Sequence, residues 1–178
     1  MNLNKKKILA ISGSTRKNST NESILRRIAS IYAASLDLEL YLDIANLPHF
    51  NPDSDNEKVY SEVKHFRKLI EIADGVIICT PEYVFSLPGT LKNAIDWTVS
   101  TTVFTNKPVA MIVASTGGER AFESLELILR TLGARVPEGS RLLLQGARSK
   151  VGDKGDLLDE NTINKIRIVI DSLIATIT

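Results

Sequence analysis

Hydrophobic residues along the chain fall into two patterns, and these patterns alternate. Short runs without a polar residue occupy residues 8–11, 76–79 and 109–114. Such runs are typical of strands that are covered on both faces of a parallel sheet. A further segment, residues 38–43, alternates apolar and polar side chains with period two, which predicts a half-exposed strand at a sheet edge.

Between these runs, apolar residues recur every three or four positions, which predicts amphipathic helices. Gly75 and Gly133 are interpreted as the stop signals of two of these helices, and Pro88 as a firm N-terminus of a third. The apolar positions of the predicted helices lie within residues 24–32, 59–73, 88–97, 121–132 and 163–177.

The last part of the sheet is ambiguous in the sequence. Residues 134–136 predict a short final strand, whereas residues 141–145 either extend it or form an edge, and residues 146–155 predict a polar loop. Strands and helices thus alternate throughout. This predicts a doubly wound five-stranded parallel sheet of order 2-1-3-4-5, with helices on both faces and right-handed crossovers.

Composition narrows the class of protein. A chain of 178 residues, 43% hydrophobic and 24% charged, suits one soluble globular domain spanning 1–178. The net charge of +1 argues against nucleic acid as the main partner, and no apolar run reaches membrane-spanning length. The single cysteine, Cys79, excludes an intramolecular disulfide and fits a reducing cytoplasm.

The loop after the first predicted strand carries the strongest candidate chemistry. Gly13 permits a sharp turn, and Arg16 adds a positive charge. Backbone N–H groups and short polar side chains at the N-terminus of a helix form a cradle for an anion. The alternative is an ordinary loop whose Ser, Thr and Asn residues cap the helix. Hydroxyl or amide side chains stand at positions 12, 14, 15, 18, 19, 20 and 21.

Two common anions are excluded by inspection of this loop. The chain lacks G-x-x-x-x-G-K-[ST], so the lysine and hydroxyl that bind a nucleoside triphosphate and its magnesium are missing. It also lacks G-x-G-x-x-G, because residues 13–18 read Gly-Ser-Thr-Arg-Lys-Asn, which argues against a dinucleotide-binding turn. A terminal phosphomonoester remains, such as the one in flavin mononucleotide (FMN).

Two more loops follow the strands that neighbour the first one in the predicted order. Residues 80–89 hold two prolines, Tyr83 and Phe85, so this loop is stiff and suits a flat ligand. Residues 115–118 end in two glycines, which permit a close backbone approach. All three loops are expected to meet at one edge of the sheet. Alternatively, Tyr83 and Phe85 pack on a neighbouring helix or another subunit.

Two motifs in these loops resemble those of a known family. Residues 13–21 match the pattern G-S-x-R-x-x-S-x-N completely. Residues 81–97 match P-E-Y-N-x-S-x-P-G-x-L-K-N-A-I-D-W, with Val84 in place of the usual asparagine. On these residues the chain resembles the NADPH-dependent FMN reductase family of flavodoxin-like proteins, and the resemblance runs over nearly the whole chain.

The resemblance implies a set of cofactor-binding positions. Residues of the first motif match those that hold the FMN phosphate, residues 81–83 match the loop along the isoalloxazine ring, and residues 115–118 match the loop at its pyrimidine edge. Val84 leaves backbone contacts intact but removes a side-chain hydrogen bond, and Phe85 is expected to narrow the pocket. The implied positions are Ser14, Arg16, Ser19, Thr20, Asn21, Pro81, Glu82, Tyr83, Val84, Ser115, Thr116, Gly117 and Gly118.

The resemblance also implies the reaction. Reduced nicotinamide, NADPH or NADH, passes hydride to FMN, and a quinone, azo compound, metal oxyanion or free flavin then accepts it. Because the cofactor supplies the redox chemistry, we assign no catalytic side chain. We assign no metal site either, because the acidic residues at 53 and 55 lack the glycine and glutamate of a calcium loop.

Several alternatives remain open at this stage. A flavodoxin-type electron carrier or redox sensor would bind FMN without nicotinamide turnover, although such carriers are usually strongly acidic. A third interpretation is an interaction module without flavin. The resemblance suggests a homodimer or homotetramer with Phe85 and Trp97 at the interface. Arg120 and Arg148 either meet the 2′-phosphate of NADPH or form surface salt bridges.

Overall fold

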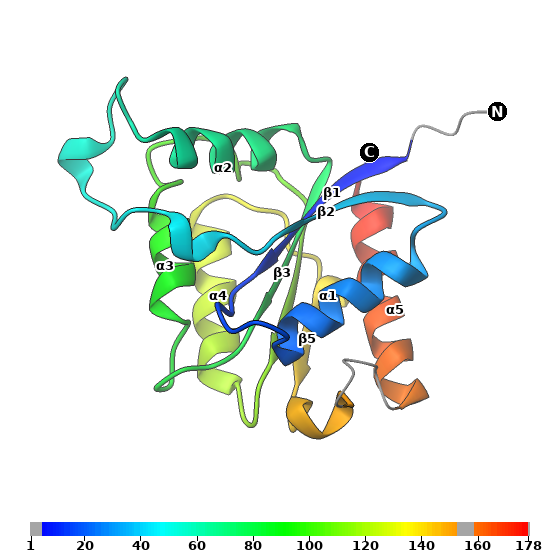
Figure 1. Cartoon of the computed structure of the whole chain (residues 1–178). Helices are drawn as coiled ribbons and strands as arrows, with labels where there is room; N and C mark the ends of the chain where they lie inside the picture. Colours follow the sequence, from blue (N-terminus) through cyan, green and yellow to red (C-terminus); the bar gives the residue numbers. More distant parts are fainter. Residues whose placement is uncertain (1–4, 153–158, 178) are drawn as a thin grey trace.

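The computed structural model describes residues 5–152 and 159–177. Within them, five parallel strands form one sheet of order β2-β1-β3-β4-β5 (Figure 1), which confirms the predicted order. The strands are β1 (Lys6–Ser12), β2 (Leu36–Tyr41), β3 (Gly75–Thr80), β4 (Val109–Ala114) and β5 (Arg141–Leu144).

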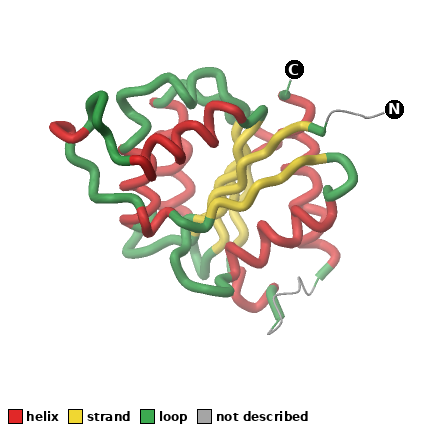
Figure 2. The backbone as a smooth tube through the Cα atoms, turned by 45° about the horizontal axis from the view of Figure 1, so that its top comes forward, coloured by secondary structure: helices red, strands yellow, loops and turns green. Residues whose placement is uncertain are grey.

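Helices cover both faces of this sheet (Figures 1 and 2). Helices α1 and α5 pack on one face, and α2, α3 and α4 pack on the other. No helix in the described residues is long and apolar enough to cross a membrane. The helices are α1 (Thr20–Ile31), α2 (Ser61–Ile72), α3 (Gly89–Asp96), α4 (Glu119–Thr131) and α5 (Glu160–Thr176).

The apolar runs behave as expected of central strands. Every residue of β3 and β4 is buried. In β1, Ile8 and Ala10 join the core under α1 and α5, whereas Leu9 and Ile11 join the core under α2, α3 and α4. Successive side chains therefore enter opposite cores, which is why these strands lack polar alternation. Edge strand β2 starts and ends two residues before the predicted segment 38–43.

The predicted final strand is wrong. Residues 134–136 form no strand, and Arg135 makes only an isolated bridge with Pro108. The edge strand is β5, which pairs with β4 in parallel. A physical reason lies in Pro137, which has no N–H to donate to a ladder and starts a short 3₁₀ helix instead. Residues 153–155 of the predicted polar loop lie outside the described residues.

The two glycine stop signals have different outcomes. Gly133 follows α4 with a φ of 75°, which confirms it as a left-handed helix terminator. Gly75 does not terminate α2, which ends three residues earlier; it is the first residue of β3. A Cβ at Gly75 would lie 3.0 Å from Ile177 Cδ1 and 3.3 Å from Ile8 Cδ1, so glycine serves close packing there.

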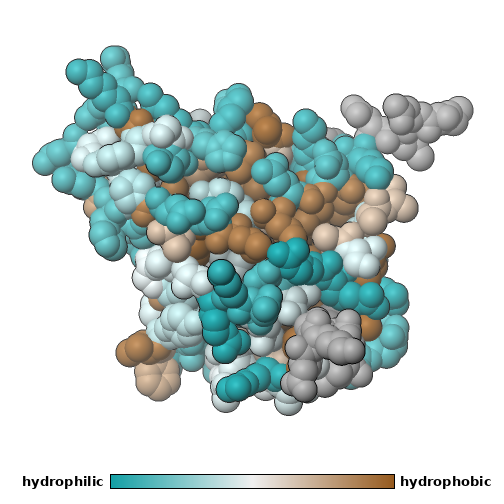
Figure 3. All heavy atoms as spheres, in the orientation of Figure 1, coloured by the Kyte–Doolittle hydropathy of each residue, from teal (hydrophilic) through white to brown (hydrophobic). Residues whose placement is uncertain are grey.

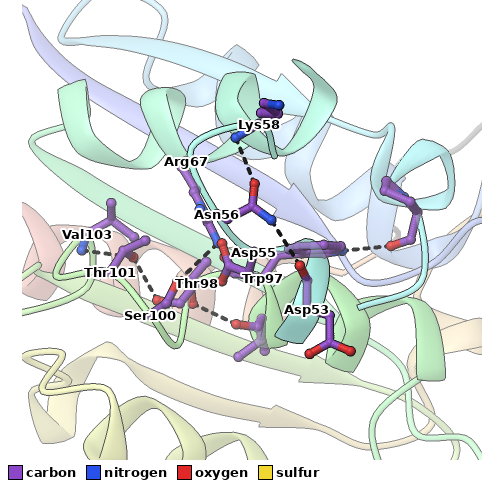
Figure 4. A network of polar contacts seen from close by, with 12 residues as sticks. Asp53, Asp55, Asn56, Lys58, Arg67, Trp97, Thr98, Ser100, Thr101 and Val103 are labelled. Carbon is purple, nitrogen blue, oxygen red and sulfur yellow. Dashed lines mark hydrogen bonds and ion pairs between the residues drawn. The ribbon is translucent and has the colours of Figure 1, made fainter. Parts of the chain in front are cut away.

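A buried ion pair fixes the long segment between β2 and α2 (Figure 4). Arg67 on α2 donates from Nη2 to Asp55 Oδ1 at 2.7 Å and from Nε to the carbonyl of Trp97 at 2.6 Å. Ser100 Oγ donates to the second oxygen of Asp55 at 2.5 Å. The Arg67 and Asp55 side chains are only 15% and 7% exposed, so this network ties the segment to α2 and to the end of α3.

This network predicts a pH dependence of stability. Burial raises the pKa of Asp55, but hydrogen bonds from Ser100 and Arg67 and the charge of Arg67 lower it by more, so the pKa lies below the ordinary 3.8. The stabilisation is therefore fully present above pH 3.8 and is lost as pH falls through the lower pKa of the folded state. In urea unfolding, the stability difference between wild type and Asp55→Asn is expected to shrink below that pH.

The exposed Asp53 on the same segment supplies the control. Asp53→Asn is expected to follow the wild-type pH profile, because that carboxylate has no ion-pair partner among the described residues. A difference between wild type and Asp55→Asn that stays constant over the acid range would contradict the assignment.

Candidate cofactor-binding site

The turn from β1 into α1 is pressed against β3. The Gly13 N–H donates to the carbonyl of Cys79 at 2.8 Å. A Cβ at Gly13 would lie 2.3 Å from Thr80 Oγ1 and 2.6 Å from Thr80 Cβ, so only glycine fits. Ser12 Oγ accepts from the Ser14 N–H at 3.3 Å and donates to the Ser14 carbonyl at 3.1 Å, which braces the turn.

Helix α1 presents its N-terminus to this turn. Ser19 Oγ accepts from the Glu22 N–H at 3.1 Å, and Glu22 Oε2 accepts from the Asn18 N–H at 3.0 Å. The N–H groups of Thr20 and Asn21 have no acceptor among the described residues. Capping therefore satisfies only part of the helix end, and two backbone donors remain for an anion at the positive end of the helix dipole.

The side chain of Asn21 ties this helix end to two strands. Its Nδ2 donates to the carbonyl of Ala114 on β4 at 3.4 Å, and its Oδ1 accepts from Cys79 Sγ on β3 at 3.3 Å. Burial raises the pKa of the Cys79 thiol, so the sulfur stays protonated and can donate. Asn21 thus holds the start of α1 over the ends of the two central strands.

The loop between β3 and α3 contains a tight hairpin. Tyr83 and Ser86 exchange backbone hydrogen bonds of 2.9 and 3.0 Å. Val84 and Phe85 between them have φ values of 50° and 58°, the conformation of a type I′ turn. Their side chains are 95% and 79% exposed. This loop forms the hydrophobic projection at the lower left of Figure 3, below α3 in Figure 1.

Glu82, next to the hairpin, joins this loop to the following one. The N-cap of α4 is Gly118, which has a φ of 113° and no side chain with which to cap the helix. Glu82 Oε2 instead accepts from the Ala121 N–H in the first turn of α4 at 3.0 Å. A carboxylate from one loop therefore caps the helix that follows another loop, and the two loops are fixed relative to each other.

A fourth segment, which follows β5, lies against the loop that follows β4. The carbonyl of Ser115 accepts from the Ala147 N–H at 3.0 Å, and the carbonyl of Thr116 accepts from the Gly146 N–H at 3.2 Å. These bonds place the 3₁₀ helix η4 (Ala147–Lys150) beside the loop that follows β4.

These four segments line a cavity of about 290 Å³ at the carboxyl ends of the strands, the lower edge of the sheet in Figure 1. It combines backbone donors, hydroxyls and guanidinium groups with the ring surfaces of a proline and a tyrosine. This set of groups fits a phosphorylated planar ligand. The lining residues are Ser14, Arg16, Ser19, Thr20, Asn21, Pro81, Glu82, Tyr83, Ala114, Ser115, Thr116, Ala147 and Arg148.

Comparison with known proteins agrees with this geometry. The family model described as NADPH-dependent FMN reductase matches residues 6–148. The chain belongs to the NADPH-dependent FMN reductase family. Its structure resembles that of FerB, a flavoenzyme NAD(P)H:(acceptor) oxidoreductase from Paracoccus denitrificans, with a TM-score of 0.82, 29% identity and 97% of each chain covered.

Two relatives known by name are similar over most of their length. The chain is 37% identical to the NADH:(hydroxy)cinnamate reductase subunit CrdA of Vibrio ruber, over 89% of this chain and 80% of that protein. It is 32% identical to the quinone reductase of Escherichia coli, over 91% of this chain and 90% of that protein. This membership confirms the resemblance drawn from the motifs, and the flavodoxin-like fold with it.

Most positions that the resemblance implies lie on the cavity, but three do not. Val84 is at the tip of the hairpin, Gly118 is the N-cap of α4, and Gly117 precedes it. Phe85, expected to narrow the pocket, is not among the lining residues either. Contact between these residues and FMN stays a prediction.

The structure adds three lining residues that the motifs did not indicate: Ala114, Ala147 and Arg148. Ala114 ends a strand whose position was predicted, so its place at the cavity follows from the sheet order. Ala147 and Arg148 lie in a segment predicted as polar loop, in which Arg148 was a candidate for either the 2′-phosphate of NADPH or a surface salt bridge. They reach the cavity through the backbone bonds to residues 115 and 116, which leave no pattern in the sequence.

The prediction that Trp97 lies at a subunit interface is wrong. Trp97 is fully buried, and its Nε1 donates to the carbonyl of Pro48 at 2.7 Å. The apolar spacing of α3 already placed it on the inward face, and this packing leaves no surface for a partner. Phe85 remains exposed.

The positive φ of Val84 in the hairpin predicts that replacing this residue stabilises the protein. Val84 is β-branched, and a positive φ brings such a side chain into conflict with its own backbone. Because this side chain is almost fully exposed, replacing it costs no packing. Val84→Asn is therefore expected to raise the free energy of unfolding by about 0.5–1 kcal/mol, measured by urea denaturation.

Val99, 61% exposed and without a positive φ, supplies the matched control. Val99→Asn is expected to leave the free energy of unfolding unchanged or slightly lower. Equal effects of the two substitutions would show that the turn carries no strain. The asparagine of the family pattern thus has a conformational explanation besides a hydrogen bond to the ligand.

Proposed function

We propose that this protein transfers hydride from NADPH or NADH through bound FMN to a small acceptor of the quinone or azo class. One observation carries the proposal. Hydrogen-bond donors at the start of α1 that suit a phosphate line the same cavity as the rings of Pro81 and Tyr83, although the two groups come from loops far apart in the chain. Membership in the family and similarity to a quinone reductase support the same reaction.

FMN supplies the redox chemistry when it is bound, and the chain supplies binding and orientation. The hydroxyls of Ser14 and Ser19, the Arg16 guanidinium and the free N–H groups at the start of α1 hold the phosphate. The aromatic ring of Tyr83 and the apolar ring of Pro81 would offer packing surfaces to an aromatic ring system. Through its hydrogen bond to α4, Glu82 fixes the loop that carries Pro81 and Tyr83 relative to the loop that carries Ser115 and Thr116.

Anaerobic mixing of the FMN-loaded protein with NADPH or NADH tests the proposal. The yellow flavin absorbance is expected to bleach on mixing and to return when a quinone is added. Protein that binds FMN but is bleached by neither nicotinamide would support the electron carrier or sensor instead. Protein whose melting temperature rises with neither FMN nor FAD would favour the interaction module.

We further propose that the protein acts in the cytoplasm as a homodimer or homotetramer. The exposed, hydrophobic Val84–Phe85 tip beside the cavity supports an oligomer, because water-exposed apolar side chains gain from burial against a partner. Light scattering of the purified protein tests this, and a fully active monomer would refute it.

A further inference from the structure

We infer that Arg148 is a phosphate-binding residue of this cavity. Its guanidinium group takes a phosphomonoester, which is either the 5′-phosphate of FMN or the 2′-phosphate of NADPH. This inference rests on the proposed function and adds a specificity-determining residue to it.

The backbone holds Arg148 at the cavity wall. Gly146, with a φ of 60°, turns the chain at the end of β5, and its N–H donates to the carbonyl of Thr116. Ala147 is 1% exposed, packs in the core under α1 and α5, and donates to the carbonyl of Ser115. The Cα of Arg148 is therefore fixed beside the loop that follows β4, whereas its side chain is exposed and lines the cavity.

Charge balance explains why a second guanidinium belongs there. A phosphomonoester carries a charge of about −1.5 to −2 at pH 7, and Arg16 supplies only one positive charge. Among the described residues that line the cavity, Glu82 is the only acidic one, and it is engaged with the N-terminus of α4. Arg148 supplies the missing positive charge, and the planar fork of a guanidinium matches two phosphate oxygens at once.

The structure separates Arg148 from Arg120, which the sequence alone did not. Arg120 pairs with Glu123 on the surface of α4 at 2.8 Å and does not line the cavity. Arg148 lines the cavity and has no ion-pair partner within residues 5–152 and 159–177. Arg120 is thus a matched control for Arg148.

Ligand pairs that differ by one phosphate test the inference. FMN and riboflavin differ by the 5′-phosphate, and adenosine 2′,5′-bisphosphate and 5′-AMP differ by the 2′-phosphate. Dissociation constants of all four are measured for the full-length wild type, Arg148→Ala, Arg148→Lys and Arg120→Ala. Flavin fluorescence quenching and titration calorimetry report binding independently of turnover. Reduction of bound FMN by NADPH and NADH is measured on the same samples.

In Arg148→Ala, binding of the phosphorylated member of one pair is expected to weaken about 10-fold to 100-fold, with its partner ligand unchanged. Weakening confined to FMN assigns Arg148 to the flavin phosphate. Weakening confined to the bisphosphate, with a matching rise of KM for NADPH but not for NADH, assigns it to the nicotinamide. The dissociation constants of Arg148→Lys are expected to lie between those of wild type and Arg148→Ala, since lysine keeps the charge but lacks the planar fork of the guanidinium. Those of Arg120→Ala are expected to match wild type.

The inference is overturned if Arg148→Ala binds all four ligands as wild type does, or if both members of a pair weaken equally. A wild-type protein that favours neither phosphorylated ligand overturns it too. Wild-type protein that shows the phosphate dependence but is not reduced by either nicotinamide would instead refute the proposed function while leaving the assignment of Arg148 in place.

Discussion

Gly13→Ala is expected to lower the free energy of unfolding by about 1–3 kcal/mol, because the added methyl group overpacks a closed site. The new Cβ would lie 2.3 Å from Thr80 Oγ1 and 3.0 Å from Leu91 Cδ2. Both neighbours are buried, with exposures of 0% and 1%, so neither can swing into solvent. The turn must move away from β3 instead, and the bond from the Gly13 N–H to Cys79 is lost or stretched.

That displacement also changes the site. The turn positions Ser14, Arg16 and the N-terminus of α1 around a phosphate. FMN binding to Gly13→Ala is therefore expected to weaken at least 10-fold, which corresponds to about 1.4 kcal/mol. Riboflavin binding is expected to change less, because it lacks the phosphate. Urea denaturation and flavin fluorescence quenching measure the two effects.

Gly89, the first residue of α3, is the matched control. A Cβ there would have no heavy atom within 4 Å, and its φ is not positive. Gly89→Ala is expected to leave FMN binding unchanged and to stabilise the protein by up to about 1 kcal/mol, since alanine favours a helix. If Gly13→Ala behaves like Gly89→Ala, the close approach of the turn to β3 is not a constraint.

The parts of the fold that could be predicted are those in which neighbouring residues share one environment. β1, β3 and β4 are buried on both faces, so their composition alone marks them as central strands. The end of the sheet differs, because residues 134–136 and 141–145 are both short and apolar. Residues 134–136 make a single isolated bridge beside the start of β4, whereas β5 pairs with β4 along its whole length, and that choice depends on where the chain returns after α4.

The candidate site divides in the same way. The turn at Gly13 and the wall at Pro81–Tyr83 could be predicted, since each motif is contiguous and follows a recognisable strand. The sequence offered both Arg120 and Arg148 as phosphate candidates but could not show that Arg148 is the one at the cavity. Its position depends on backbone bonds between segments far apart in the chain, as in Ala147 to Ser115. The substitution at Val84 was visible in the sequence, but the positive φ that makes it costly was not.

Glu82→Ala is expected to weaken the coupling between two walls of the cavity. It leaves the Ala121 N–H without its acceptor, and Gly118 has no side chain to replace it. The free energy of unfolding is expected to fall by about 1–2 kcal/mol, as for the loss of a helix cap. Glu82→Gln keeps an acceptor oxygen, so its free energy of unfolding in urea denaturation is expected to fall by less than half as much.

The ligand dependence of Glu82→Ala distinguishes this coupling from a contact to phosphate. In this variant the two loops are no longer joined, so they must be ordered when the flavin ring binds. This cost is the same for both ligands, and the binding of FMN and of riboflavin is therefore expected to weaken by the same factor, about 10-fold. Glu123→Ala, which removes a surface carboxylate of α4 that is 62% exposed, is the control and is expected to bind both flavins as wild type does. A loss confined to FMN would contradict the coupling, because the carboxylate of Glu82 would then act on the phosphate end of the cavity and not on the loops around the ring.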